Sequence, residues 1–148
     1  MSSPATVRTR RALATNDVAM LFYGMSAVLI GPTLPGMIES FDLSLGQGGF
    51  ISAAQNAGGF VGAILSLWIA DRVSRPWTVV VSFMLLAAAL FGVGVAPDYL
   101  VLLAAFALSG FFIRTLDVAL NAHTGTLAGA RSGRAMSLLH MFFSIGAF

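Results

Sequence analysis

Four apolar runs, each long enough to cross a membrane, constrain this chain more than any other feature. They cover about 18–38, 48–70, 77–96 and 99–122, and a fifth run, 135–148, is too short to cross. A helix rises about 1.5 Å per residue, so about 20 residues cross a hydrocarbon core roughly 30 Å thick. Helices satisfy their own backbone hydrogen bonds in lipid. The sequence therefore predicts an all-α polytopic membrane bundle of four full transmembrane helices plus the start of a fifth.

The composition excludes several other classes of protein. Only 9% of residues are charged and 57% are hydrophobic, whereas soluble proteins carry about 25% charged residues. The chain has no cysteine, and its two histidines, His123 and His140, lack the spacing of metal ligands. Asp117 has no second intramembrane Asp to form a catalytic pair. We therefore predict no metal, cofactor, nucleic-acid partner or enzymatic activity.

The fourth apolar run contains charges that lipid would penalise. Gly110, Arg114, Asp117 and Asn121 follow the spacing i, i+4, i+7, i+11, which places them on one helix face. A charged residue at the centre of a span costs roughly 2.5 to 3.5 kcal/mol, so this face should meet other helices or a wet cavity. It is a candidate transport pathway. Alternatively, Arg114 and Asp117 neutralise each other and pin the helix in a bundle.

The second apolar run combines small residues with two amides. Small residues recur every four positions, a pattern that lets helix backbones approach closely in lipid. Gln55 and Asn56 lie in the same run and serve either as hydrogen bonds between helices or as substrate ligands. The small residues are Ala54, Gly58, Gly62 and Ser66.

Two prolines make the first run irregular. Pro32 and Pro35 remove backbone donors from its second half, so we expect a kink there, where neighbouring helices or water satisfy the freed carbonyls. The preceding segment, 1–16, is a polar tail that carries three arginines.

Arginines predict the orientation of the chain. Seven of the eight lie in the tail 1–16, in the loop 71–76 or in the loop 124–134, and the other two loops have none. Because loops rich in Lys or Arg stay in the cytoplasm, we expect a multi-pass protein of the plasma or inner membrane with a cytoplasmic N-terminus.

The loop after the second run resembles the motif Gly-x-Leu-Ala-Asp-Arg-x-Gly-Arg-Arg/Lys of the major facilitator superfamily. Ala70, Asp71, Arg72 and Arg75 match it, whereas Leu67, Ser74 and Pro76 stand where the motif has other residues. Members have about twelve spans in two six-helix halves. The resemblance implies that residues 17–148 form part of an N-terminal six-helix transport domain whose partner is a C-terminal half.

The fourth and fifth runs resemble the fucose:proton symporter-like branch of that superfamily. Gly110, Asp117 and Asn121 keep three of the five fixed positions of Gly-x-Gly-x-Gly-x-x-Asp-x-x-x-Asn, and His140 precedes Phe-Ser-Ile-Gly-Ala where that branch has His before Phe-Gly-x-Gly-Ala. The resemblance implies a secondary active transporter that couples a sugar-like solute to protons.

His140 and Asp117 should lie equally deep. Each is about five residues from the loop that joins its helix to the other, so we expect them to form part of a proton relay. A packing or capping role for His140 is the alternative. The predicted substrate and proton pathway comprises Arg114, Asp117, Asn121, His140, Gln55 and Asn56. The competing function is a small membrane-embedded helix-packing protein without transport activity.

Overall fold

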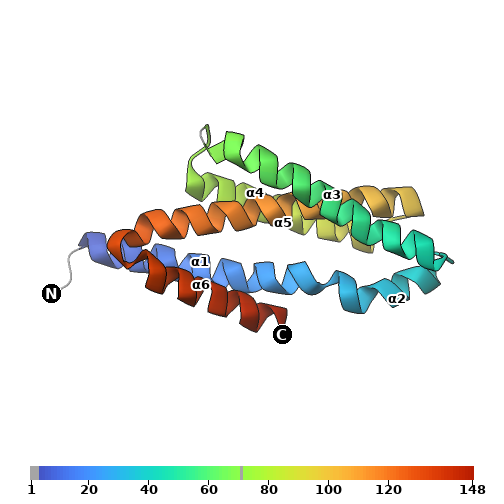
Figure 1. Ribbon diagram of the computed structural model, residues 1–148, viewed down its shortest axis with the longest axis horizontal. Coiled ribbons are helices and arrows are strands. Elements are labelled where there is room, and N and C mark those ends of the chain that lie inside the picture. Colours follow the sequence, from blue (N-terminus) through green and yellow to red (C-terminus); the bar gives the residue numbers. More distant parts are fainter. Residues whose placement is uncertain (1–3, 71) are drawn as a thin grey trace.

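Every secondary-structure element is helical in the computed structural model, which describes residues 4–70 and 72–148 (Figure 1). This confirms the predicted all-α bundle. Within the described residues, four segments are long and apolar enough to span a membrane: 6–40, 45–69, 75–94 and 99–147. The elements are α1 (Pro4–Val28), α2 (Ile30–Ser40), α3 (Leu45–Ala70), α4 (Arg75–Gly94), α5 (Tyr99–Ala128), the 3₁₀ turn η1 (Gly129–Arg131) and α6 (Ser132–Ala147).

Helix α5 is the centre of the bundle. It contacts α3 and α4 on one side and α1 and α6 on the other (Figure 1). Its buried side chains therefore point in several directions: Leu102 and Phe106 pack with Ile51 of α3, while Leu116 and Leu120 join a cluster with residues of α1, α4 and α6. The helix that carries the candidate pathway residues is thus held on most of its circumference.

The first predicted span breaks into two helices. Helix α1 ends at Val28, four residues before Pro32, and α2 begins at Ile30. Pro32 has no N–H to donate to the Val28 carbonyl, and its ring collides with that group in a regular helix. The next carbonyl, that of Leu29, keeps its helical partner and accepts from Thr33 twice, from the backbone N–H at 3.2 Å and from the hydroxyl at 2.6 Å. The predicted irregularity is confirmed at this break.

Glycines bring α3 and α5 into backbone contact. A Cβ added at Gly58 would overlap the carbonyl of Ala107, and one added at Gly62 would overlap that of Phe111. In return, a Cβ at Gly110 of α5 would overlap the carbonyl of Gln55. These contacts confirm the packing role predicted for Gly58 and Gly62 among the small residues of the second run. Lipid supplies no hydrophobic drive between helices, so close packing of this kind holds them together.

A second glycine contact joins α1 to α6. A Cβ at Gly24 would overlap the Phe143 carbonyl, and a Cβ at Gly146 would overlap the Leu21 carbonyl. The rings of Tyr23 and Phe143 lie beside this contact, with centroids 5.4 Å apart. The bundle therefore consists of two close helix pairs, α3 with α5 and α1 with α6, and α4 packs on α5 from outside.

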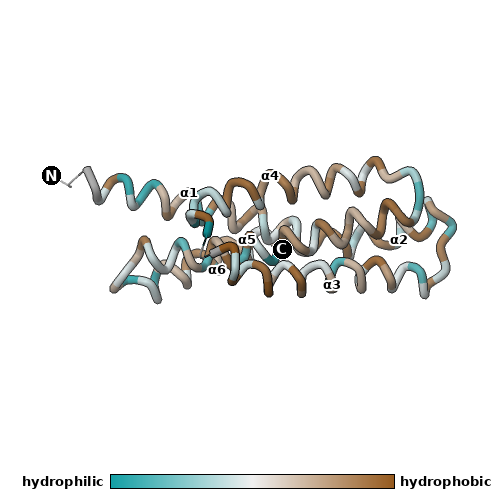
Figure 2. The backbone as a smooth tube through the Cα atoms, turned by 90° about the horizontal axis from the view of Figure 1, so that it is seen from above, coloured by the Kyte–Doolittle hydropathy of each residue, from teal (hydrophilic) through white to brown (hydrophobic). Residues whose placement is uncertain are grey.

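The turn between the last two helices differs from the prediction. Most of the segment 124–134, expected as a loop, is helical: α5 continues to Ala128 and α6 begins at Ser132. The chain reverses at Gly129, whose φ of 52° suits a residue without a Cβ. Likewise α1 begins at Pro4, inside the segment expected as a tail (Figure 2). Polar sequence therefore did not predict where these helices begin and end.

Candidate functional site

The predicted polar face of α5 exists and is internally bonded. Nη1 of Arg114 lies 3.8 Å from Oδ2 of Asp117. The Asn121 amide donates to Oδ1 of Asp117 at 2.8 Å and to its backbone carbonyl, also at 2.8 Å. The Asp117 carboxylate is therefore held between a cation and an amide on its own helix.

Arg114 is the more open member of this ion pair. Its side chain is 54% exposed, against 26% for Asp117. The arginine emerges over Gly59 of α3, where an added Cβ would come 3.0 Å from Cγ of Arg114. Gly59 therefore gives the arginine stem its space, a role that the sequence did not reveal. The guanidinium retains donors beyond its contact with Asp117.

Arg114 opens into a pocket of about 220 Å³, which we call the polar pocket. Four helices line it: α1 through Tyr23 and Ala27, α3 through Gln55, Asn56 and Gly59, α5 through Gly110, Ile113 and Arg114, and α6 through Phe143. The structure thus brings together three predicted residues, Gln55, Asn56 and Arg114. Tyr23 was not predicted, although an aromatic hydroxyl inside an apolar run is a recognisable signal.

Gln55 and Asn56 differ in their surroundings. Gln55 is half-buried and lines both the polar pocket and a second cavity, of about 640 Å³, that lies between α2 and the ends of α3, α4 and α5. Asn56 is exposed, and its amide donates to the Ser52 carbonyl at 2.8 Å. Gln55 is therefore the residue that the two spaces share.

His140 lies on α6, which packs against α5. Its side chain is exposed. Among the described residues, no hydrogen bond joins His140 to Asp117. The proton relay remains a prediction.

The loop motif is described only in part. Asp71 lies outside the described residues, as does the side chain of Ala70. Arg72 stacks over the Trp68 ring, 4.0 Å from its centroid. Arg75 donates a hydrogen bond to the Thr126 hydroxyl on α5. One arginine of the loop thus stays local, and the other fastens the loop to the central helix.

A buried polar cluster joins α1 to α5 near the Arg-rich end of the bundle, where the start of α1 and the turn between α5 and α6 carry arginines. The Asn16 amide donates to Oγ1 of Thr124 at 2.9 Å and lies 3.2 Å from Nδ1 of His123. Asn16 and the adjacent Asp17 are both buried. The sequence analysis missed this cluster because Asn16 falls at the edge of the apolar run. Two successive polar residues, Asn16 and Asp17, directly before the first apolar run were the available signal.

An apolar helical bundle with charged and amide groups facing an internal pocket defines the class of polytopic membrane proteins with a polar pathway. Residues 18–148 match the Major Facilitator Superfamily, and the chain belongs to that family. It is 23% identical over 130 residues to sodium-dependent glucose transporter 1A of Mus musculus, an alignment that covers 88% of this chain. The chain spans 31% of the length of that relative. No solved structure was found to match it.

Proposed function

We propose that this chain forms one side of the substrate pathway in a secondary active transporter for a small polar, sugar-like solute. The polar pocket carries the proposal, because a tyrosine hydroxyl, two amides and a guanidinium from three helices meet there inside an apolar bundle. These groups supply both donors and acceptors, which a solute rich in hydroxyls requires. The similarity to a glucose transporter supports the same class of solute.

The size of the polar pocket supports a shared site. Pockets that enclose a small molecule measure about 300 to 1,000 Å³, whereas this one measures about 220 Å³ and is open. Transporters with repeated halves bind substrate between the halves near the middle of the bilayer. We therefore expect a C-terminal half of a longer transporter to cover Arg114 and Asn56 and to complete the site.

Asp117 is the proposed coupling residue. A nearby cation favours an ionised carboxylate, and burial favours the neutral form. If the contact between Asp117 and Arg114 differs between the outward-open and inward-open states, the affinity of Asp117 for a proton differs as well, and proton movement is coupled to substrate. The name of the mouse relative makes sodium the second candidate ion, since a carboxylate with an amide oxygen nearby also suits a hard cation.

Uptake into proteoliposomes tests the proposal. The protein encoded by the whole reading frame, including any codons after Phe148, is reconstituted and given labelled glucose or fucose under an imposed proton gradient or an imposed sodium gradient. We expect one gradient to drive accumulation above the external concentration. Accumulation of neither sugar under either gradient would overturn the proposed solute class.

The second candidate function is a membrane-embedded helix-packing protein. The glycine contacts of α3 with α5 and of α1 with α6 favour it, because they show a chain specialised for close helix association. Sequencing the gene beyond the codon for Phe148 separates the two functions. Further apolar spans support the transporter, whereas an immediate stop codon supports the packing protein.

A further inference from the structure

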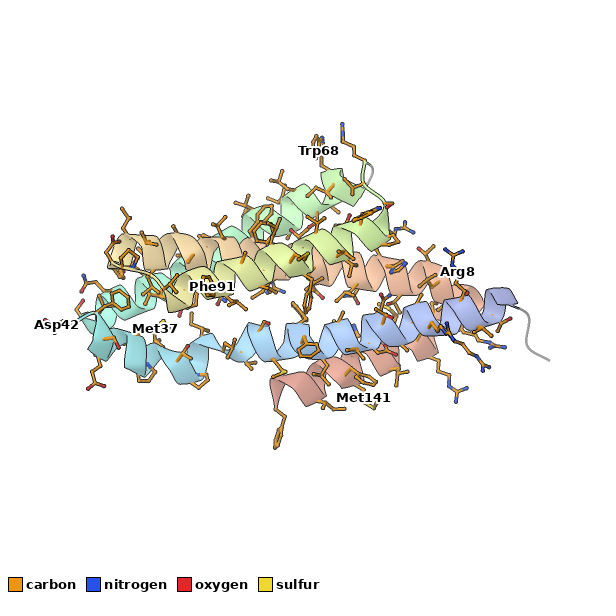
Figure 3. All side chains as sticks on the ribbon, turned by 180° about the vertical axis from the view of Figure 1, so that it is seen from behind. Arg8, Met37, Asp42, Trp68, Phe91 and Met141 are labelled. Carbon is orange, nitrogen blue, oxygen red and sulfur yellow. The ribbon has the colours of Figure 1, made fainter. Side chains whose placement is uncertain are left out.

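A cavity of about 990 Å³ lies at the Arg-rich end of the bundle. It is bounded by the first turns of α1, by the end of α5 with η1, and by the first half of α6. None of the described residues that line it also lines the polar pocket. We call it the basic cavity, because Arg10, Arg131 and Arg134 lie around it on three different elements. Figure 3 shows Arg8 at this same end and Asp42 at the opposite one.

Apart from Asp17, the lining of the basic cavity changes from arginine to apolar side chains along the bundle axis. Leu13 is one helical turn further along α1 than Arg10. On α6, Leu138 and Met141 lie about one and two turns beyond Arg134, in the direction in which the helix runs into the membrane. The cavity therefore offers cations near the membrane surface and hydrocarbon contacts below them.

The three arginines around the basic cavity form no ion pair with any described carboxylate. Within the part of the chain that the structure describes, the only ion pair joins Arg114 to Asp117, so no described carboxylate neutralises them. Asp17 also lines the cavity, but it lies two turns along α1 from Arg10, about 10 Å deeper. An anion near Arg10 would therefore meet attraction before it met this carboxylate.

The start of α6 adds a second attraction for an anion. Its N-cap residue, Arg131, makes no capping hydrogen bond through its side chain, although the Ser132 N–H donates to the Gly129 carbonyl. The N-terminal dipole of this 16-residue helix also favours negative charge. The arginine fork suits phosphate, which accepts two parallel N–H bonds.

We propose that the basic cavity binds an anionic phospholipid, with its phosphodiester between Arg10, Arg131 and Arg134 and one acyl chain against Leu13, Leu138 and Met141. A soluble phosphate would use the arginines but not the apolar lining. The expected orientation places this end in the cytoplasmic leaflet, which is the anionic one. The proposal is independent of what the polar pocket carries.

Lipid retention by the purified chain tests this assignment. The chain in neutral detergent is titrated with palmitoyl-oleoyl phosphatidylglycerol, and bound lipid is counted by native mass spectrometry. The double variant Arg131→Gln/Arg134→Gln should lose affinity about tenfold or more, since each arginine removed takes away charge-assisted hydrogen bonds to the phosphate. The control is Arg8→Gln/Arg11→Gln, which has the same net charge, removes arginines outside the cavity lining, and should change affinity less than about twofold because these arginines do not line the site that holds the phosphate. Equal losses in both double variants would overturn the proposal, because general charge attraction would then explain binding.

Four further experiments identify the occupant. Phosphatidylcholine with the same acyl chains should bind more weakly than phosphatidylglycerol, and glycerol phosphate should not displace the lipid. Leu138→Ser should weaken lipid binding and gives a readout even if the double arginine variant fails to fold. Displacement by glycerol phosphate would indicate a site for soluble phosphate and overturn the lipid assignment. Loss of binding in the product of the whole reading frame would do the same, because another helix would then fill the cavity.

Discussion

The backbone carbonyl of Gln55 lies directly against Gly110, with no room for a side chain between them. This contact places the Gln55 amide beside Arg114 in the polar pocket, because the two helices meet one turn away from the arginine. Packing and polar geometry are therefore set by the same glycines. A change that separates α3 from α5 should also disturb the pocket.

Gly58→Leu and Gly62→Leu should each reduce the yield of folded protein. Both side chains would meet backbone carbonyls of α5, which cannot rotate away, and overpacking costs about 1 to 3 kcal/mol or more. Monodisperse protein recovered after detergent extraction measures the effect.

Gly49→Leu is the matched control for these variants. It lies on the same helix, is exposed, and has nothing within 4 Å of its Cβ position, so its yield should stay normal. If Gly58→Leu and Gly62→Leu accumulate normally and change which solute is carried, the glycines line the pathway instead of packing the helices.

Asn16→Leu should destabilise the bundle by about 1 to 3 kcal/mol, because the buried Thr124 hydroxyl and the half-buried His123 ring would lose their hydrogen bonds to Asn16. The free energy of unfolding in mixed detergent micelles measures this. Thr15→Ala, next to it but exposed and bonded only to the Arg11 carbonyl, should change it by less than about 0.5 kcal/mol. Similar values for both variants would show that the cluster does not hold α1 to α5.

Single cysteines report the orientation, since the chain has none of its own. Ser74→Cys in the Arg-bearing loop should be protected from an impermeant thiol reagent added outside intact cells, and Ser40→Cys at the end of α2 should react. The loop between α4 and α5 also lacks arginine, but its Asp98 is a poor site for a cysteine, because the Asp98 carboxylate accepts a hydrogen bond from the Val101 N–H at 2.9 Å and caps α5. The reverse labelling pattern would invert the topology.

In the complete transporter, Asp117→Asn should abolish accumulation driven by the coupling ion and leave exchange of substrate measurable. The amide keeps the shape and a hydrogen bond to Asn121 but cannot change charge. Glu39→Gln, an exposed acid outside both pockets, should behave as the unmodified protein. Uphill accumulation that survives Asp117→Asn removes this residue from coupling and leaves it a structural role.

His140→Gln should alter the pH dependence of transport. In the predicted relay His140 exchanges a proton with Asp117, so removing the imidazole should change how transport responds to pH. Initial uptake rates between about pH 5.5 and 8 should therefore vary less in the variant than in the unmodified protein. An unchanged profile would assign His140 to packing alone.

The sequence predicted the features that depend on local sterics. The break before Pro32 and the contacts of Gly58 and Gly62 follow from missing donors and missing Cβ atoms, which are properties of single residues. The spacing of Arg114, Asp117 and Asn121 likewise determines that they share a face.

Pairing between distant segments could not be predicted in this way. Asn16 meets Thr124 because α1 and α5 cross near one end of the bundle, and no local pattern specifies that crossing. The ends of the helices were also missed, because α1 and α5 include polar segments that were expected as a tail and a loop. Hydropathy reports whether a segment favours lipid or water, whereas helix propensity reports whether its backbone stays helical, and a polar segment can remain helical.

In both close helix pairs, α3 with α5 and α1 with α6, the second helix is translated only after at least one other helix has been made. Helices α3 and α4 meet chiefly through α5, which is made after both, and Gly24 of α1 meets Phe143 of α6. At about 5 to 20 residues per second, the roughly 120 residues between Gly24 and Phe143 take about 6 to 24 s to translate. Helix α1 therefore waits in the membrane without its closest neighbour until the ribosome has made nearly the whole segment, so insertion and assembly of this bundle are separate events in time.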